Sequence, residues 1–457
     1  MKKENRRITI IKKSSNSYDY GTERFRKSWI GQIYLNRVKK FPVLRKLVLL
    51  LWRYIYPAFM NVLLKIAIYL NVGWAMRWRN IVRLNDLIIL KCLQKIKVSD
   101  AEKIETPTPQ VFPEKESIWL RSPHKEYTFP EIYVTKLENA TVIGGTNLII
   151  HENNIICHDF YNFESDYTSE EMHGRIVIDP KHKRARMLFV DKRPEYIDTA
   201  ASFLDACAPN YAHWMTEVLP RIAIFCSIGT LKGVPIVVND NLHENIMESL
   251  FLIAGQEREI ICIASGRFLN VRNLYVTSAA GYVPFDWRER DKPGKSHGEF
   301  SPKALELVRK KIIEFSEAAA KREFHEKIFI HRNSGYRKVV NISEIEKELL
   351  SRGFKIIQPE KFSFLNQVRL FKNAKCIIGS SGAALGNIIF AKKHTKIIIL
   401  ISKNINTSYW YWQNIACACG NKISYVLGDP AGDVNYGIHS DFLVNIEQLI
   451  SSIEGEV

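Results

Sequence analysis

The chain has 457 residues, enough for two or three domains, and its 46% hydrophobic and 25% charged content is that of a globular protein. Its net charge of +17 is concentrated, because residues 1–100 hold 22 Lys and Arg against 5 Asp and Glu. The eight cysteines include no Cys-x-x-Cys pair, which argues against a zinc or redox protein, and we expect no metal site. No secretory signal opens the sequence, so we expect a cytoplasmic location.

Residues 1–100 are expected to form a basic, amphipathic region. Charged residues and Pro57 interrupt the apolar stretch 47–76, leaving no run of the roughly 20 residues that a spanning helix needs. Flanking aromatic and basic residues suit helices that lie on an anionic membrane surface through residues 30–95. A subdomain packed on the rest of the chain, or a contact in a homo-oligomer, is the alternative. Nucleic acid is not expected, since no recognised binding motif accompanies the charge.

The remaining chain predicts two α/β domains, 101–300 and 301–457. The Pro-containing stretch 101–116 predicts a linker, and short β-branched runs between 130 and 160 predict hairpins. From about residue 200, helices alternate with strands, which predicts a parallel sheet covered by helices. A last helix, at about 440–453, is expected to pack back on the first domain.

The clearest pattern lies in residues 325–401, where four short apolar strands alternate with three helices, as in one Rossmann-like half. Ligands of such sheets bind beyond the carboxyl ends of the strands. After the first strand, Arg332, Arg337 and Lys338 can hold a diphosphate through charge-assisted hydrogen bonds. A solvated basic turn is the alternative.

The loop after the third strand, 379–387, is rich in small residues. These let the backbone approach a phosphate, and the helix that follows presents free N–H groups. The alternative is a turn needed only for packing a helix on the sheet. The candidate contacts with a phosphate are Ser380, Ser381, Gly382, Ala383 and Asn387.

A second polar cluster opens the predicted helix from about 210. His213 and Glu217 are four residues apart and share a helix face, so they could act as a general base toward a hydroxyl group, with Asp205 as a further candidate. The rings of Tyr211 and Trp214 could stack on a sugar. The alternative is that these residues only begin a helix, in which His213 has its hydrogen bonds satisfied and Trp214 belongs to the hydrophobic core. The candidate contacts with the sugar that accepts the transferred group are Asn210, Tyr211 and Trp214.

Residues 328–400 resemble glycosyltransferase family 61. The resemblance is carried by Ile328-Phe-Ile-His-Arg332, Phe364-Leu-Asn-Gln367, Gly379-Ser-Ser-Gly-Ala383 and, upstream, Asn210-Tyr-Ala-His-Trp214. It implies a GT-B-like fold of two Rossmann-like domains facing a cleft, inversion at the anomeric carbon and no metal. It also implies that Arg332, Arg337 and the 379–387 loop hold a nucleotide-sugar donor, and it suggests a site function for His213.

One position departs from this family. Ser381 stands where the family usually has a histidine, and a serine cannot carry positive charge or act as a base near pH 7. His331 or His394 could take over its contact.

The expected function is that of an inverting, metal-independent glycosyltransferase in surface or capsular polysaccharide synthesis, extending a lipid-linked saccharide at the inner face of the plasma membrane. No Asp-x-Asp occurs, so basic side chains would have to stabilise the leaving diphosphate. The alternative is a non-catalytic nucleotide- or sugar-binding subunit of a polysaccharide assembly complex, which Ser381 favours. A Rossmann oxidoreductase lacks its G-x-G-x-x-G fingerprint.

Overall fold

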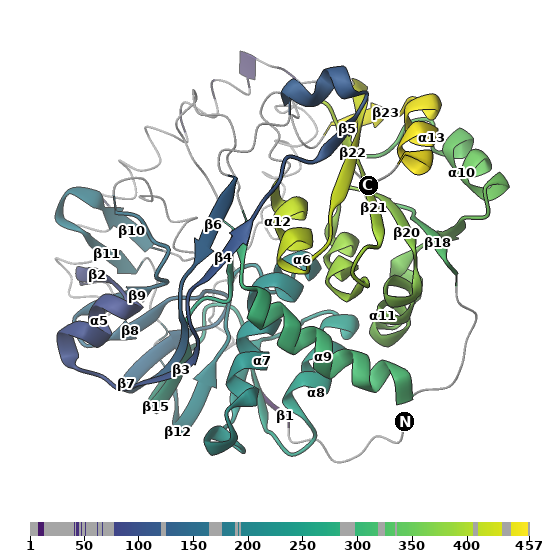
Figure 1. Cartoon of the computed structure of the whole chain (residues 1–457). Helices are drawn as coiled ribbons and strands as arrows, with labels where there is room; N and C mark the ends of the chain where they lie inside the picture. The colour runs from purple at the N-terminus through teal and green to yellow at the C-terminus, as the bar shows by residue number, and fades with distance from the viewer. Residues whose placement is uncertain are drawn as a thin grey trace.

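The structure is a computed structural model in which two large sheets, each covered by helices, lie side by side (Figure 1). It describes residues 8–12, seven positions between 41 and 66, and residues 77–455 except for 120–124, 164–175, 188–190, 192, 284–297, 319–324, 334–335, 405–409 and 432–439. The helices expected in the basic N-terminal region therefore fall almost entirely outside the described residues. Within the part that is described, no helix is long and apolar enough to cross a bilayer.

The first sheet is built around four parallel strands in the order β14-β13-β12-β15. Their bounds are β12 (Glu195–Ser202), β13 (Ile236–Asn239), β14 (Ile260–Ile263) and β15 (Phe268–Thr277). Ile236 and Val238 enter one hydrophobic core and Val237 the opposite one, so both faces of β13 are buried, as in a parallel sheet. The alternation of helices and strands predicted from residue 200 is confirmed.

The helices of this sheet lie mainly on one face. The predicted helix from 210 consists of α6 (Tyr211–His213), a π-helical turn η6 (Trp214–Val218) and α7 (Leu219–Ser227), and α8 (Glu244–Ala254) follows β13. On the opposite face, α5 (Leu84–Lys91) contributes Leu84, Leu87 and Ile88 to the second core.

Antiparallel strands extend the first sheet beyond β15. β15 pairs with β7 (Ile132–Ile143), which pairs with β8 (Ile149–His151), and β8 pairs with β9 (Asn154–Cys157). These are the hairpins predicted between 130 and 160. The outer strands are β2 (Arg79–Arg83), β11 (Arg184–Met187) and β10 (Ile176–Asp179), while β3 (Lys95–Ser99) pairs with β7 and β1 (Ile8–Ile11) lies at the opposite edge beside β14.

The second sheet has the parallel order β19-β18-β20-β21-β22. Its strands are β18 (Lys327–Ile330), β19 (Lys355–Ile357), β20 (Cys376–Ser380), β21 (Lys396–Ser402) and β22 (Ile423–Ala431), with β23 (Asp441–Leu443) antiparallel at the edge. Its helices are α10 (Ile342–Ser351), α11 (Phe364–Asn373) and α12 (Trp410–Ala418). The four strands predicted in 325–401 are confirmed, although the helix after β20, η9 (Ala383–Phe390), is a 3₁₀-helix.

Two predictions about the chain's path are wrong. Residues 101–116 are not a free linker, because β5 (Gln110–Phe112) pairs parallel with β22 in the second sheet and β4 (Glu102–Glu105) pairs with β6 (Glu126–Phe129). The backbone groups of this Pro-containing stretch are satisfied by strands far away in sequence, which local composition cannot reveal. The last helix, α13 (Ile446–Glu454), lies against β22 and β5 and buries Leu449 in the second sheet's core, not in the first unit.

The two units are joined by an extensive contact. A helix absent from our sequence-based expectations, α9 (Pro302–Ala318), packs against α7 and α8 of the first unit and α11 of the second (Figure 1). The Glu248 carboxylate of α8 accepts from the Phe364 and Leu365 amides at the start of α11, and the Ser363 side chain makes no capping hydrogen bond there. One hydrophobic core contains buried residues of both sheets.

Candidate active site

Strand order brings two loops together at one edge of the second sheet. The chain leaves β18 for β19 on one side and returns through β20 on the other side of β18. In open α/β sheets, ligands bind in the crevice where the strand order reverses in this way. Residues 331–338 follow β18 and residues 381–387 follow β20. The two loops singled out from the sequence therefore begin at this reversal of strand order.

Arg332 and Arg337 lie against the second loop. Arg332 Nε donates to the Tyr336 carbonyl oxygen at 2.8 Å, and Arg337 Nη1 lies 3.5 Å from Ser381 Oγ. A Cβ on residue 382 would overlap Arg332 Nη1, so Gly382 is the residue that leaves room for this guanidinium. The small-residue loop thus accommodates an arginine side chain.

The charges of these two arginines are only partly offset locally, by the Asp441 carboxylate near Arg332. Among the described residues neither forms an ion pair with a carboxylate, and Arg337 Nε is buried without a hydrogen-bond partner. Burial, together with the neighbouring Arg337, lowers the pKa of Arg332 to about 10, and burial also lowers the pKa of Arg337. Two adjacent, desolvated cations cost free energy that a bound anion would offset. The arrangement is therefore that of an anion-binding site.

The other predicted contacts of this site have different surroundings. Ser380 and Ser381 are 5% and 6% exposed, and Ser381 Oγ accepts from Trp412 Nε1 at 3.0 Å. The Lys338 side chain is exposed, and its backbone amide donates to Asp441. Ala383 is half-buried.

Asn387 holds the two units together. It is fully buried, accepts from Tyr211 Oη at 2.7 Å and donates to Gln367 Oε1 at 2.8 Å. A direct contact between Asn387 and a donor is therefore not supported. His331 is also turned away, since its Nδ1 lies 2.5 Å from Glu346 of α10.

The predicted pair of His213 and Glu217 is formed. His213 Nδ1 lies 2.5 Å from Glu217 Oε1, and the two side chains are 18% and 7% exposed. Burial disfavours the charged imidazole, but the Glu217 carboxylate outweighs this effect and raises the pKa of His213. Glu217 belongs to the π-helical turn η6, a feature common at functional sites. A histidine held by a carboxylate in this way is equipped to act as a general base.

Asp205 has a different environment from the one expected of a base. One of its oxygens lies 3.0 Å from Arg221 Nη2, and the other accepts from the Cys207 amide at 2.8 Å. Both partners of the ion pair are largely buried. Asp205 thus stabilises Arg221, and its role as catalytic base is not supported.

Two of the three predicted acceptor residues have structural roles. Asn210 caps α6 by accepting from the Ala212 amide at 3.0 Å. Trp214 is 0% exposed and donates to Ser249 Oγ at 2.8 Å, so no ring face is available to a sugar and the predicted stacking is wrong. The half-buried Tyr211 contacts Asn387, as described above.

Two aromatic residues of α12, which the sequence argument missed, connect the two clusters. The Tyr411 ring lies 6.3 Å from the His213 ring, and its hydroxyl lies 3.3 Å from Thr216 Oγ1. The adjacent Trp412 bonds Ser381. The run Trp410-Tyr411-Trp412 is visible in the sequence, but only the fold reveals that Tyr411 lies beside His213 and Trp412 beside Ser381.

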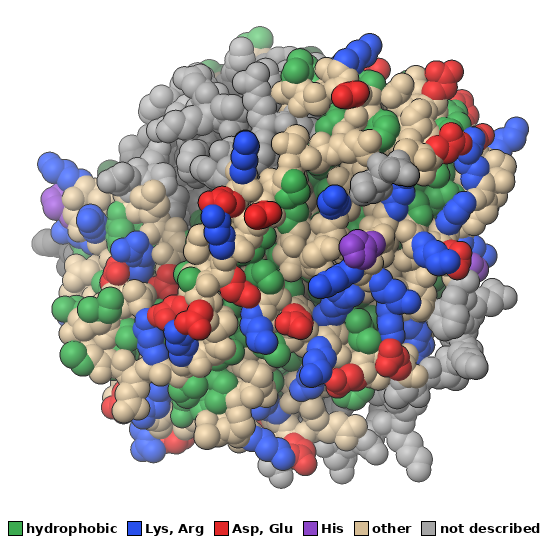
Figure 2. Space-filling view, in the orientation of Figure 1, with side chains coloured by type: hydrophobic (Ala, Val, Ile, Leu, Met, Phe, Trp, Pro, Cys, Tyr) green, Lys and Arg blue, Asp and Glu red, His purple; other side chains and the backbone are tan. Residues whose placement is uncertain are grey.

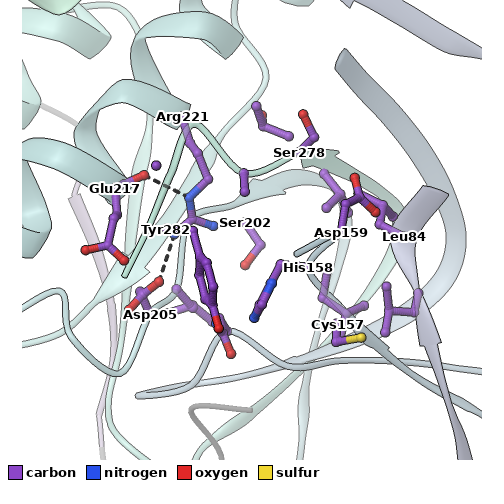
Figure 3. Close-up of a pocket in the computed structure, with 18 residues that line it drawn as sticks. Leu84, Cys157, His158, Asp159, Ser202, Asp205, Glu217, Arg221, Ser278 and Tyr282 are labelled. Carbon is purple, nitrogen blue, oxygen red and sulfur yellow. Dashed lines mark hydrogen bonds and ion pairs between the residues drawn. The ribbon is translucent and has the colours of Figure 1, made fainter. Parts of the chain in front are cut away.

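A pocket of about 70 Å³ lies at the corresponding position of the first sheet, at the carboxyl ends of β12 and β15 (Figure 3). The strand order reverses there too. Arg221 lies between Asp205 and Glu217 in Figure 3, and the Tyr282 ring lies 4.4 Å from the His158 ring. Because Glu217 lines this pocket and also holds His213, the pocket and the pair share a wall.

Part of the chain matches a known protein family. The family described as Glycosyltransferase 61 matches residues 211–398, from α6 into β21. The resemblance to glycosyltransferase family 61 is confirmed. The match indicates a glycosyltransferase, and its residues include His213, Glu217 and both arginines. No curated protein matches the chain.

The site extends beyond the segment that matches family 61. Asp205 and His158 precede the matched residues, and Tyr411 and Trp412 follow them. All four contact residues inside the segment: Arg221, Tyr282, His213 and Ser381, respectively. The surroundings of this candidate site are therefore assembled partly from regions that the family match does not cover.

Proposed function

We propose that the chain is an inverting, metal-independent glycosyltransferase of the GT-B kind, which moves a sugar from a nucleotide-sugar donor to a saccharide acceptor. The observation that carries this proposal is the pair of half-buried arginines, Arg332 and Arg337, beside a small-residue loop at the strand-order reversal. The family 61 match supports the same reaction class.

The arginines suit the leaving group of such a reaction. As the glycosidic bond to the donor breaks, negative charge grows on the nucleoside diphosphate. Guanidinium groups stabilise that charge through forked hydrogen bonds, and they do so most strongly where water is excluded. The desolvation of Arg332 and Arg337 supports this role, and the Gly382 loop would let the phosphates approach the backbone.

The His213–Glu217 pair suits the acceptor half of the reaction. In an inverting displacement, the acceptor hydroxyl attacks the anomeric carbon while a base accepts its proton. We assign the base to His213, with Glu217 orienting the ring and stabilising the imidazolium. The pocket lined by Glu217 and Tyr282 would hold the acceptor sugar, since it combines polar groups with aromatic rings. The contact of the Tyr411 ring with the His213 ring supports a short distance between the donor-binding and acceptor-binding parts of the site.

The acceptor would be lipid-linked and the enzyme peripheral on the inner face of the plasma membrane, in surface or capsular polysaccharide synthesis. The charge surplus of residues 1–100 supports attraction to anionic lipids. Several described apolar side chains of this region are exposed, among them Phe41 (58%), Val43 (80%) and Leu47 (54%), and these suit insertion into a membrane surface.

The proposal is tested by measuring donor hydrolysis and transfer for UDP-, GDP-, CMP- and dTDP-sugars in the presence of EDTA, with wild type and His213→Ala. We expect the wild type to turn over one of these donors and the variant to bind it without turnover. A wild-type chain that binds a nucleotide sugar but neither hydrolyses nor transfers it would instead favour a non-catalytic subunit, for which Ser381 is the supporting feature.

A further inference from the structure

Two short strands, β16 (Gly281–Tyr282) and β17 (Glu299–Phe300), form a small antiparallel sheet beside the pocket of the first unit. β16 follows β15, and the Tyr282 side chain lines the pocket (Figure 3). β16 also packs directly on the π-helical turn η6, since a Cβ on residue 281 would overlap the Thr216 carbonyl oxygen. β17 is therefore held at the edge of the pocket by a strand that lines it.

The pairing of these strands places the Glu299 side chain on the pocket side of β17. Glu299 lies directly opposite Tyr282, and opposite residues of an antiparallel pair point to the same face. The Tyr282 ring lines the pocket and lies 4.4 Å from the His158 ring. Phe300 points to the other face, where its ring lies 5.6 Å from the Tyr411 ring. Glu299 thus adjoins the pocket on one side, and Phe300 contacts the neighbour of His213 on the other.

The fold supplies no partner for the Glu299 carboxyl group. This group is half-buried, it forms no hydrogen bond or ion pair among the described residues, and burial raises its pKa to about 7. The Tyr127 hydroxyl donates to the carbonyl oxygen of the adjacent Phe300 at 2.9 Å. A carboxyl group that is partly withdrawn from water without a partner costs free energy, which hydrogen-bond donors of a ligand would offset.

Exposed carboxylates elsewhere in the molecule have a different setting. On the face shown in Figure 2, Asp and Glu side chains lie interspersed with Lys and Arg side chains. Glu126 of β6, for example, pairs with Lys103 of β4 at 2.8 Å, and both side chains are exposed. Glu299 is less exposed and has no such cation among the described residues, which distinguishes it from a solvated surface charge.

The charges around the pocket indicate the class of ligand. The carboxyl groups of Asp159, Asp205 and Glu217 line it. Arg221 is the one Lys or Arg side chain in the described lining, and it is paired with Asp205 at 3.0 Å. With Glu299 beside this lining, a sugar that carries a carboxylate would meet like charges and no unpaired guanidinium or ammonium group. The hydroxyl groups of a neutral sugar can instead donate hydrogen bonds to these oxygens.

We infer that Glu299 is an acceptor-binding residue, whose carboxyl group accepts a hydrogen bond from a hydroxyl group of a neutral saccharide in the pocket and disfavours saccharides that carry a carboxylate. This inference rests on the proposed function. It adds one residue to the acceptor site and specifies the charge class of the acceptor.

Saturation-transfer NMR titration of the full chain tests the inference without a donor. The probes are the methyl glycosides of glucose and galactose and those of the matching uronic acids, at about pH 8, where Glu299 is ionised. We expect wild type to bind one neutral glycoside about tenfold more tightly than its acidic counterpart, and Glu299→Gln to weaken that neutral glycoside about tenfold. The matched control is Glu257→Gln, whose side chain is 80% exposed, and it should change the affinity less than about twofold.

The unfolding temperature of Glu299→Gln should equal that of wild type or exceed it, because the carboxyl group has no partner in the fold. Unchanged affinity for the neutral glycoside in Glu299→Gln would overturn the inference. A wild-type preference for the acidic glycosides, or no saturable binding of either neutral glycoside, would also overturn it. Because these titrations need no donor, wild type that transfers sugar while Glu299→Gln binds normally would refute this inference alone. Binding through Glu299 without transfer would refute only the proposed reaction.

Discussion

The carboxyl ends of the two parallel sheets carry arginines in opposite electrostatic settings. In the first sheet, Arg221 pairs with Asp205 at 3.0 Å and donates to the Glu217 carbonyl oxygen at 3.1 Å. In the second, Arg332 and Arg337 have no carboxylate partner among the described residues. A cation that is paired with a carboxylate stabilises the fold, whereas a desolvated cation without such a partner suits the binding of an anionic ligand. The partner, and not the residue type, decides the role.

Removing both unmatched arginines should have the largest effect on activity. For Arg332→Ala/Arg337→Ala we expect kcat/KM to fall by about 10⁴-fold, since each lost donor to a developing oxyanion costs about 10²–10³-fold. The unfolding temperature should stay the same or rise, because two partly desolvated charges without an ion-pair partner are removed. The control is Arg272→Ala, an exposed arginine paired with Asp198. A large drop in stability would indicate that the arginines are structural.

Removing the base should reduce kcat by about 10³-fold in His213→Ala. A base works when deprotonated, so activity should rise with pH through the pKa of His213, which the Glu217 carboxylate raises above its ordinary value. Glu217→Gln should therefore move this inflection of the pH–rate profile to lower pH. An unchanged inflection in Glu217→Gln would exclude His213 as the titrating base.

Breaking the Asp205–Arg221 ion pair should lower stability more than it lowers kcat. Asp205→Asn leaves the Arg221 charge buried without its partner, which should lower the free energy of unfolding by about 3 kcal/mol, measured by urea titration. Asp205→Asn/Arg221→Met should recover much of that loss. If Asp205→Asn instead kept wild-type stability and lost kcat, Asp205 would return as the base.

The smallest effect is expected at the glycine beside Arg332. In Gly382→Ala the new methyl group displaces the Arg332 guanidinium, and we expect about tenfold weaker donor binding by calorimetry. Gly229→Ala, where a Cβ meets no atom within 4 Å, is the control. Equal donor affinity in Gly382→Ala and wild type would mean that Arg332 binds the donor from another position.

Local pattern was sufficient to predict four strands of the second sheet and to single out the two loops that follow β18 and β20. The apolar strands at 327, 355, 376 and 396 are short and continuous, and the rule that ligands bind beyond strand ends then points to Arg332 and Arg337. The contact between His213 and Glu217 could also be predicted from local pattern, because residues four apart on a helix lie close together.

What the sequence could not provide were contacts between distant segments. Trp214 and Asn387 were expected to bind ligands, but they bond Ser249, Tyr211 and Gln367 in the interior. Polar and aromatic side chains serve cores and sites equally well, and only tertiary packing separates the two uses. The pairing of β5 with β22 was hidden similarly, because an edge strand of three residues has no period to detect.

The most direct test of the donor site is calorimetric titration of wild type and Arg332→Ala/Arg337→Ala with UDP, GDP, dTDP and CMP. We predict that wild type binds one of these nucleotides with heat that reports a saturable site, and that the double variant, equally well folded, shows no saturable binding. Equal affinity in the two proteins, or no binding of any of them to wild type, would contradict the assignment of Arg332 and Arg337 to the donor.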